Sequence, residues 1–173
     1  RHVVLVRHNS YLFKGTVEEN LRMAKSDATE AEMNAVLEKV NLLGFLQTQD
    51  GLQTKLLEKA GNLSGGQCQR LAIARALLRD SSVYIFDEAA SNIDVESEEL
   101  IMNVIHELAK TKTVLLISHR LANVVKSDKI YFLKDGEIKE SGKHDELMSQ
   151  NGAYRHLYES QMALENYGKG GMA

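Results

Sequence analysis

The sequence predicts an α/β fold that combines a parallel sheet with a helical insert. Short apolar runs rich in β-branched residues alternate with segments of helical periodicity, an order typical of parallel α/β cores. Four runs are interpreted as strands of the kind buried in parallel sheets, at 2–6, 82–87, 113–118 and 129–134. The 173 residues are enough for one domain with a core, and too few for two.

Helical segments separate these strands. Between 27 and 40, Asp27 and Glu30 have the spacing of a capping box, which predicts a helix start. Its apolar face comprises Met33, Val36, Leu37 and Val40. The apolar face of a second predicted helix, over 96–110, comprises Leu100, Val104 and Leu108.

The last part of the chain begins with "KDGEI" (134–138), whose Asp-Gly pair predicts a tight turn between short strands. The segment from His144 to about Leu164 is expected to be helical. The glycine-rich end is expected to be a flexible tail.

Composition excludes several classes of protein. The net charge of −3, with both signs mixed along the chain, argues against a nucleic-acid-binding protein, which should carry a basic face. A single cysteine excludes an internal disulfide and fits a reducing compartment. No apolar run approaches the roughly 18 residues that span a bilayer, so the chain as written is expected to be soluble. Because it starts at Arg1 directly on an apolar run, we interpret it as a piece of a longer protein.

The most informative stretch is "NLSGGQCQRLAIARALL" (62–78). Ser64 and Gln67 have capping-box spacing, which an ordinary helix start would explain. Gly65 and Gly66, however, each weaken a first helical turn by roughly 1 kcal/mol relative to alanine. They also remove side chains that would obstruct a ligand. Because bare N–H groups at the positive end of a helix attract anions, the stretch favours a phosphate site formed by these four residues.

The string "LSGGQ", followed by "QRLAIARALL", resembles the signature motif of ATP-binding-cassette (ABC) ATPases, and "VYIFDEAASNID" resembles their Walker B strand and D-loop. The resemblance extends from about residue 3 to residue 161. It implies a P-loop NTPase (RecA-like) core with a parallel sheet, built from 1–15 and 81–161. It further implies an ABC helical and signature subdomain over about 16–80, and a flexible tail over 162–173.

The same resemblance assigns site residues. Asp87, at the carboxyl end of a strand, would hold Mg²⁺ as a hard oxygen ligand. Glu88 would orient and deprotonate the attacking water. His119 ends the strand "LLISHR" in the position of the family's switch histidine, where it can donate to a γ-phosphate oxygen. Ser91 and Asp94 would line the D-loop. Without this resemblance, an Asp-Glu pair or a lone histidine at the end of a strand would more often have a structural role than a catalytic one.

The stretch "HNSYLFKGTVEENL" (8–21) resembles the segment after the Q-loop of exporter-type members, where the chain meets the transmembrane domain. The sequence departs from the family here, because His8 occupies the usual position of a glutamine. A neutral imidazole can offer a nitrogen to water or phosphate, but it suits a hard cation less well than an amide oxygen. Two interpretations stay open: contact of His8 with the nucleotide site, or packing under the helical insert.

The phosphate loop of this family, G-x-x-x-x-G-K-[ST], does not occur in the sequence. The nearest string, "GEIKESGK" (136–143), has one spacer too many. The Walker A segment is therefore expected upstream of Arg1. Losing three hydrogen bonds to charged phosphates, each worth about 1.5–3 kcal/mol, removes about 5–9 kcal/mol, or roughly 10³–10⁶ in affinity. The isolated chain is expected neither to bind ATP measurably nor to hydrolyse it.

The resemblance implies an ATPase with ATP and Mg²⁺ as ligands, in the ATP-binding domain of an exporter at the cytoplasmic face of the membrane. The expected partners are a second ABC ATPase domain, in a head-to-tail homo- or heterodimer, and a transmembrane domain, with no nucleic acid. Residues 64–67 would act on the partner's nucleotide, and Asp87, Glu88, His119 and His8 on their own. Two alternatives stay open: a soluble ABC ATPase of the DNA-repair or translation-factor kind, and a non-hydrolysing regulatory half of a heterodimer.

Overall fold

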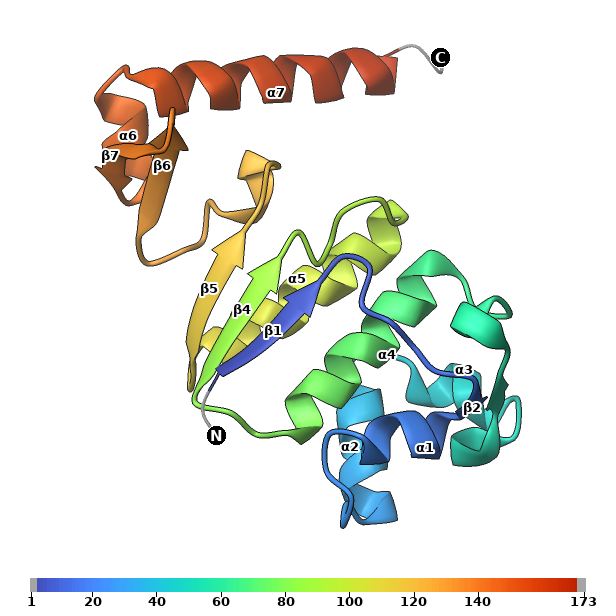
Figure 1. Ribbon diagram of the computed structural model, residues 1–173. Helices are drawn as coiled ribbons and strands as arrows, with labels where there is room; N and C mark the ends of the chain where they lie inside the picture. Colours follow the sequence, from blue (N-terminus) through green and yellow to red (C-terminus); the bar gives the residue numbers. More distant parts are fainter. Residues whose placement is uncertain (1–2, 171–173) are drawn as a thin grey trace. The chain divides into compact units, whose positions relative to one another are not determined.

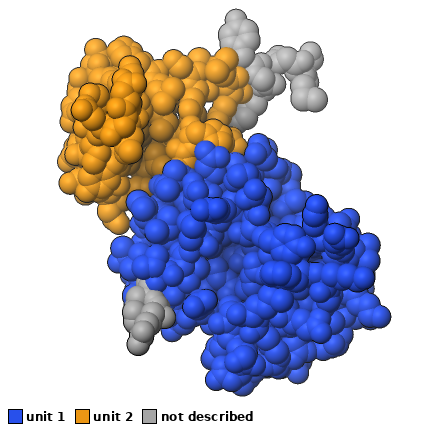
Figure 2. Space-filling view, in the orientation of Figure 1, with its two compact units in different colours: residues 1–117 blue, residues 118–173 orange. Residues whose placement is uncertain are grey.

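The computed structural model describes residues 3–170, with side chains described as far as 165 (Figure 1). The chain divides into two compact units, Arg1–Ile117 and Ser118–Ala173 (Figure 2). The first unit contains both the three-stranded sheet and the helical insert. The predicted division into a core (1–15 and 81–161) and a helical subdomain (about 16–80) stays a prediction.

The centre of the first unit is a parallel sheet with the strand order β1-β4-β5. Its strands are β1 (Val3–Arg7), β4 (Val83–Asp87) and β5 (Thr113–Ile117). Both neighbouring pairs are parallel, so the predicted α/β class with a parallel sheet is confirmed. Two helices pack on this sheet, α4 (Gly65–Leu78) against β1 and α5 (Val95–Ala109) against β5 (Figure 1).

The two faces of the sheet differ in burial. The face that contributes to the core carries Val4, Val6, Tyr84, Phe86, Val114 and Leu116. The opposite face carries apolar side chains that are about half exposed, namely Val3 (60%), Leu5 (48%), Leu115 (49%) and Ile117 (46%). The strands of this sheet are thus of the apolar kind predicted, but they are buried on one face only. Among the described residues the sequence supplies apolar side chains to both faces, while the two helices cover only one.

The helical insert lies between β1 and α4. It consists of a two-stranded antiparallel sheet, three α-helices and two short 3-10 helices. The strands are β2 (Gly15–Thr16) and β3 (Lys55–Leu56), and the α-helices are α1 (Val17–Arg22), α2 (Glu30–Lys39) and α3 (Leu43–Gln47). The 3-10 helices are η1 (Gly51–Gln53) and η2 (Glu58–Ala60). Both α1 and α2 pack on α4, which joins the insert to the sheet.

The helix predicted to start at Asp27 starts two residues later. Thr29 is the N-cap of α2, and its hydroxyl accepts a hydrogen bond from the N–H of Glu32 at 3.2 Å. The Glu32 carboxylate accepts in return from the N–H of Thr29 at 2.8 Å. Both residue pairs have capping-box spacing, but the Arg22 guanidinium donates to the Ala28 carbonyl at 2.8 Å. That bond holds residue 28 outside the helix, so the later pair forms the cap.

The buried face of α5 is rotated from the predicted one. Its buried apolar residues are Ile101, Met102 and Ile105. The predicted residues Leu100, Val104 and Leu108 are only half-buried. The apolar arc of a helix on a core is wider than a single row of residues four apart. The predicted row of residues therefore lies at the edge of the apolar face of α5, and the buried residues next to it lie at the centre of that face.

The second unit begins after β5 with a 3-10 helix, η3 (Leu121–Asn123), followed by β6 (Ile130–Lys134) and β7 (Glu137–Gly142). The last two strands pair antiparallel, so the prediction of a parallel-type strand at 129–134 is wrong. The reason is the tight turn between β6 and β7, which reverses the direction of the chain directly after β6. Asp135 and Gly136 both have positive φ, 53° and 77°, as the Asp-Gly pair predicted.

The helical end of the chain consists of two helices instead of one, α6 (His144–Ser149) and α7 (Ala153–Gly170). Asn151, with a φ of 54°, lies at the break between them. Helix α7 continues past residue 162, where the flexible tail was expected to start, and residues 171–173 of that tail lie outside the described part. Within residues 3–170, no helix combines the length and the apolar character needed to cross a membrane.

Candidate functional site

The carboxyl ends of the three parallel strands bring several of the predicted site residues together. The register places Arg7 beside Asp87, and Asp87 beside Ile117. The next residues extend this ladder, since the N–H of His8 donates to the Asp87 carbonyl at 3.2 Å and the N–H of Glu88 donates to the Ile117 carbonyl at 3.0 Å. His8, Asp87 and Glu88 therefore lie at one edge of the sheet, where α/β proteins bind ligands.

Glu88 has an unusual backbone conformation. Its φ is 50°, in the left-handed region, which costs a residue with a side chain roughly 1–2 kcal/mol. Hydrogen bonds hold Glu88 on both sides of its Cα. Its N–H donates to the Ile117 carbonyl, and its carbonyl accepts from the N–H of Ser91 at 3.0 Å. Strained residues held by their surroundings cluster at functional sites. Nothing in the sequence indicates this conformation, because a left-handed glutamate has no local signature.

The start of α4 is capped as predicted. The Ser64 hydroxyl accepts from the N–H of Gln67 at 3.2 Å, and the Gln67 side-chain oxygen accepts from the N–H of Ser64 at 2.9 Å. Both polar side chains of the motif are thus engaged with the helix start. Because the first N–H groups of a helix have no acceptor within it, the backbone at the two glycines is the part of this start suited to an anion.

The two glycines have different environments. Gly65 is exposed, and the nearest described atom to a Cβ added there would be Cγ2 of Ile93, at 4.0 Å. Gly66 is buried, and an added Cβ would lie 2.6 Å from the Cβ of Ser97 and closer still to its hydroxyl. The absence of a side chain at Gly66 is therefore required by the packing of α4 against α5. Packing thus gives a reason for Gly66 that the sequence does not reveal, and the expected ligand access at both glycines stays a prediction.

Asp94 caps helix α5. Its Oδ1 accepts from the N–H of Ser97 at 2.8 Å, and its Oδ2 lies 2.9 Å from the position of a Cβ on Gly66. Hydrogen bonds from Ser97, first from its backbone N–H, hold the pKa of Asp94 below its usual value. The Asp94 carboxylate thus organises the junction of the two helix starts. Its expected role in lining the D-loop stays a prediction.

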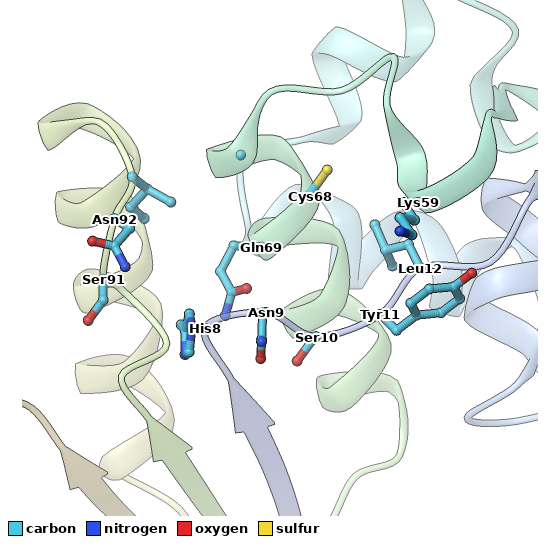
Figure 3. Close-up of a pocket in the computed structure, with 12 residues that line it drawn as sticks. His8, Asn9, Ser10, Tyr11, Leu12, Lys59, Cys68, Gln69, Ser91 and Asn92 are labelled. Carbon is cyan, nitrogen blue, oxygen red and sulfur yellow. The ribbon is translucent and has the colours of Figure 1, made fainter.

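A cavity of about 310 Å³ lies between the loop after β1, the start of α4 and the loop before α5 (Figure 3). Three residues predicted for the site line it: His8, Gly65 and Ser91. The other lining residues are Asn9, Ser10, Tyr11, Leu12, Lys59, Cys68, Gln69, Asn92 and Ile93. Segments far apart in the sequence therefore meet around this cavity.

Gln69 is a site residue that the sequence analysis missed. Its side chain is 4% exposed, and its Nε2 donates to the Arg7 carbonyl at 2.9 Å. The Ser10 hydroxyl donates to the same carbonyl at 3.0 Å. Figure 3 shows the Gln69 side chain directed from α4 toward the chain at His8. Gln69 lies one helical turn before the buried Ile73, on the apolar face of the helix. A polar residue at such a position needs a hydrogen-bond partner, and this is the signal that could have indicated its contact with another segment.

His119 belongs to the second unit, where its side chain is exposed. Its carbonyl accepts from Nε2 of Gln161 at 2.7 Å. The predicted grouping of His119 with the residues at the strand ends stays a prediction.

The side chains at the carboxyl ends of the strands can be compared with the ligands that Mg²⁺ prefers. Within the described residues, no group of three or more His, Cys, Asp or Glu side chains is arranged to hold a metal ion. Mg²⁺ in nucleotide sites, however, is usually held by one or two carboxylates together with substrate phosphates. The carboxylate of Asp87, at the carboxyl end of β4, fits that manner of binding.

Comparison with known proteins gives consistent relatives. Residues 1–91 match the family described as ABC transporter. The chain is 53% identical, over 94% of its length, to an "Uncharacterized ABC transporter ATP-binding protein" of Haemophilus influenzae, of which it covers 29%. It is 44% identical, over 92% of its length, to an "ATP-dependent lipid A-core flippase" of Mannheimia succiniciproducens, of which it covers 28%.

Among solved structures, the chain is similar to a bacterial Atm1-family ABC exporter with ATP bound. The TM-score is 0.84 at 31% sequence identity, over 92% of this chain and 28% of the exporter chain. The chain therefore spans less than a third of the length of these relatives.

Proposed function

The chain belongs to the ABC transporter family, and from this premise we propose that it forms part of the ATP-binding domain of a membrane exporter. In the intact protein, ATP hydrolysis at the interface of two such domains drives transport, at the cytoplasmic face of the membrane. The partners are a second ATP-binding domain and a transmembrane domain. The relatives named as a flippase and as an exporter support this class of function.

The observation that carries the proposal is the uncovered helix start at Gly65, beside the cavity that His8 and Ser91 also line. Amide groups at the start of a helix attract phosphate oxygens, both through the dipole of the helix and through direct hydrogen bonds. In a head-to-tail dimer, residues 64–67 of one copy approach the γ-phosphate of ATP held by the other. The sequence lacks the phosphate loop, so that loop is supplied by a segment outside these residues.

The residues at the strand ends act on the nucleotide of their own copy. Asp87 would hold Mg²⁺ through a carboxylate oxygen, and the ion, when bound, would supply positive charge to the phosphates. Glu88 accepts a proton from a water molecule as the water oxygen bonds to the γ-phosphorus. The bond from that phosphorus to the bridging oxygen breaks, and its electron pair leaves with ADP. His119 donates a hydrogen bond to a γ-phosphate oxygen, where charge is redistributed in the transition state.

Replacement of Glu88 by glutamine in the full-length protein, reconstituted in lipid bilayers, tests this assignment. The amide cannot accept the proton, so we expect kcat for ATP hydrolysis to fall by about 10²-fold or more, as for loss of a general base. ATP-bound dimers should accumulate. The matched control is Glu99→Gln, at an exposed position of α5. Undiminished turnover in Glu88→Gln would remove Glu88 from the role of base.

A further inference from the structure

In the second unit, one side chain of the last helix holds the main chain on both sides of Arg120. Gln161 of α7 donates from Nε2 to the carbonyl of His119 at 2.7 Å. Its Oε1 accepts from the N–H of Leu121 at 2.9 Å. The two ends of one carboxamide thus bind the two peptide groups that flank Arg120, one as donor and one as acceptor.

Other side chains complete the binding of this loop. The Ser118 hydroxyl donates to the Arg120 carbonyl and accepts from the Arg120 N–H, both at 3.1 Å. The Arg120 guanidinium contacts the Glu165 carboxylate at 3.3 Å. Leu121, which starts η3, is buried. The polar main-chain groups around residue 120 are therefore bound by side chains, since the loop lies beyond the end of β5 and before η3.

Helix α7 is itself fixed at its start. The Glu140 carboxylate of β7 accepts from the N–H of Ala153 at 2.5 Å, which places a negative charge at the positive end of the helix. Tyr154 is fully buried. Gln161 and Glu165, four residues apart, lie on one face of the helix. The helix is thus anchored at its first turn and contacts the loop of His119 two turns later.

We propose that Gln161 is a positioning residue for His119, and this inference rests on the role given to His119 under the proposed function. A carboxamide fixes the orientation of both peptide groups because it donates at one end and accepts at the other. A glutamate at this position could not donate to the His119 carbonyl, and an asparagine would be one methylene shorter. Helix α7 therefore fixes the main chain that carries the imidazole of His119.

The test replaces Gln161 by methionine, of similar length but without these hydrogen bonds, in the full-length transporter in lipid bilayers. Since small displacements of a catalytic group cost up to about 10²-fold, we expect kcat for ATP hydrolysis to fall about tenfold, with KM for ATP changed less than about twofold. The matched control is Glu159→Met on the same helix, which removes only an ion pair with Arg155. This control should retain the kcat of the wild type.

A double-mutant cycle with His119→Ala separates a positioning role from a general structural one. If Gln161 acts through His119, adding Gln161→Met to His119→Ala should lower kcat no further. Independent, multiplicative losses would overturn the inference, as would a normal kcat in Gln161→Met beside an impaired His119→Ala. A normal kcat in His119→Ala would overturn both its role and this inference, while leaving the Glu88 test unaffected. If Gln161→Met does not fold, Gln161→Glu, which keeps only the acceptor for Leu121, is judged by the same outcomes.

Discussion

Replacing Gly66 by alanine tests why helix α4 begins with two glycines. The added Cβ would lie 2.6 Å from the Cβ of Ser97 and 2.9 Å from Oδ2 of Asp94. Neither group can move easily, because Ser97 is buried and its N–H is bonded to Asp94 at 2.8 Å. The starts of α4 and α5 must therefore separate, and we expect a destabilisation of about 1–3 kcal/mol, the usual cost of overpacking.

Gly65→Ala is the matched variant, because an added Cβ there would meet only Ile93, at 4.0 Å. Alanine favours the helix by up to about 1 kcal/mol, so stability should be kept or slightly raised. The methyl group would, however, stand at the exposed helix start that we assign to phosphate. We expect the full-length transporter to lose about 10²-fold in kcat, comparable to the loss of one donor to a developing charge.

Hydrogen exchange of α4 and ATP turnover, both measured on the full-length protein, distinguish the two variants. A local destabilisation of 1–3 kcal/mol should accelerate exchange of the α4 amides in Gly66→Ala by about 5- to 150-fold. Adding Ser97→Gly should restore part of the protection. Wild-type protection in Gly66→Ala would refute the packing argument. Wild-type turnover in Gly65→Ala would refute the phosphate assignment.

Three further predictions concern other parts of the chain. Glu140→Ala removes the carboxylate that accepts from Ala153, and should destabilise the start of α7 by about 1–2 kcal/mol; unchanged hydrogen exchange of the first turn would contradict this. The Lys25 ammonium, and then the Thr29 N–H, lower the pKa of Glu32 from 4.5 to about 2. A lowered folded-state pKa gives stability that is present above pH 4.5 and is lost as the pH falls toward 2. In Glu32→Gln, the melting temperature should therefore depend less on pH between these values than in the wild type. A pH dependence equal to that of the wild type would contradict the ion pair. The isolated chain should show no ATP binding by calorimetry at nucleotide concentrations of about 100 μM, and tighter binding would contradict the role given to the missing phosphate loop.

The features that the sequence predicted well depend on residues close together in the chain. The capping box of Ser64 and Gln67 and the turn at Asp135–Gly136 are of this kind, because their hydrogen bonds or dihedral angles are set within four residues. The strand ends at Asp87 were also predictable, since a buried β-rich run indicates where a strand stops. Local chemistry thus identified the helix start and the sheet edge that form the candidate site.

The features that could not be predicted depend on contacts between distant segments. The space required at Gly66 is set by Ser97 on another helix, and no spacing rule connects them. Likewise, Gln69 and Gln161 bind backbone groups of loops far away in the sequence. The left-handed conformation of Glu88 depends on the neighbouring strand and on the turn that follows. Sequence patterns supplied the residues of the candidate site, whereas tertiary contacts decide which of them are exposed there and which hold their neighbours.

The position of the γ-phosphate relative to Gly65 is the most direct measure of this account. It can be obtained from a structure of the full-length transporter carrying Glu88→Gln, trapped with ATP and Mg²⁺. We predict that the Gly65 N–H of each copy lies within hydrogen-bonding distance, about 3 Å, of a γ-phosphate oxygen of the nucleotide bound to the other copy. A closed, ATP-bound dimer in which residues 64–66 face solvent or protein, away from both nucleotides, would contradict it.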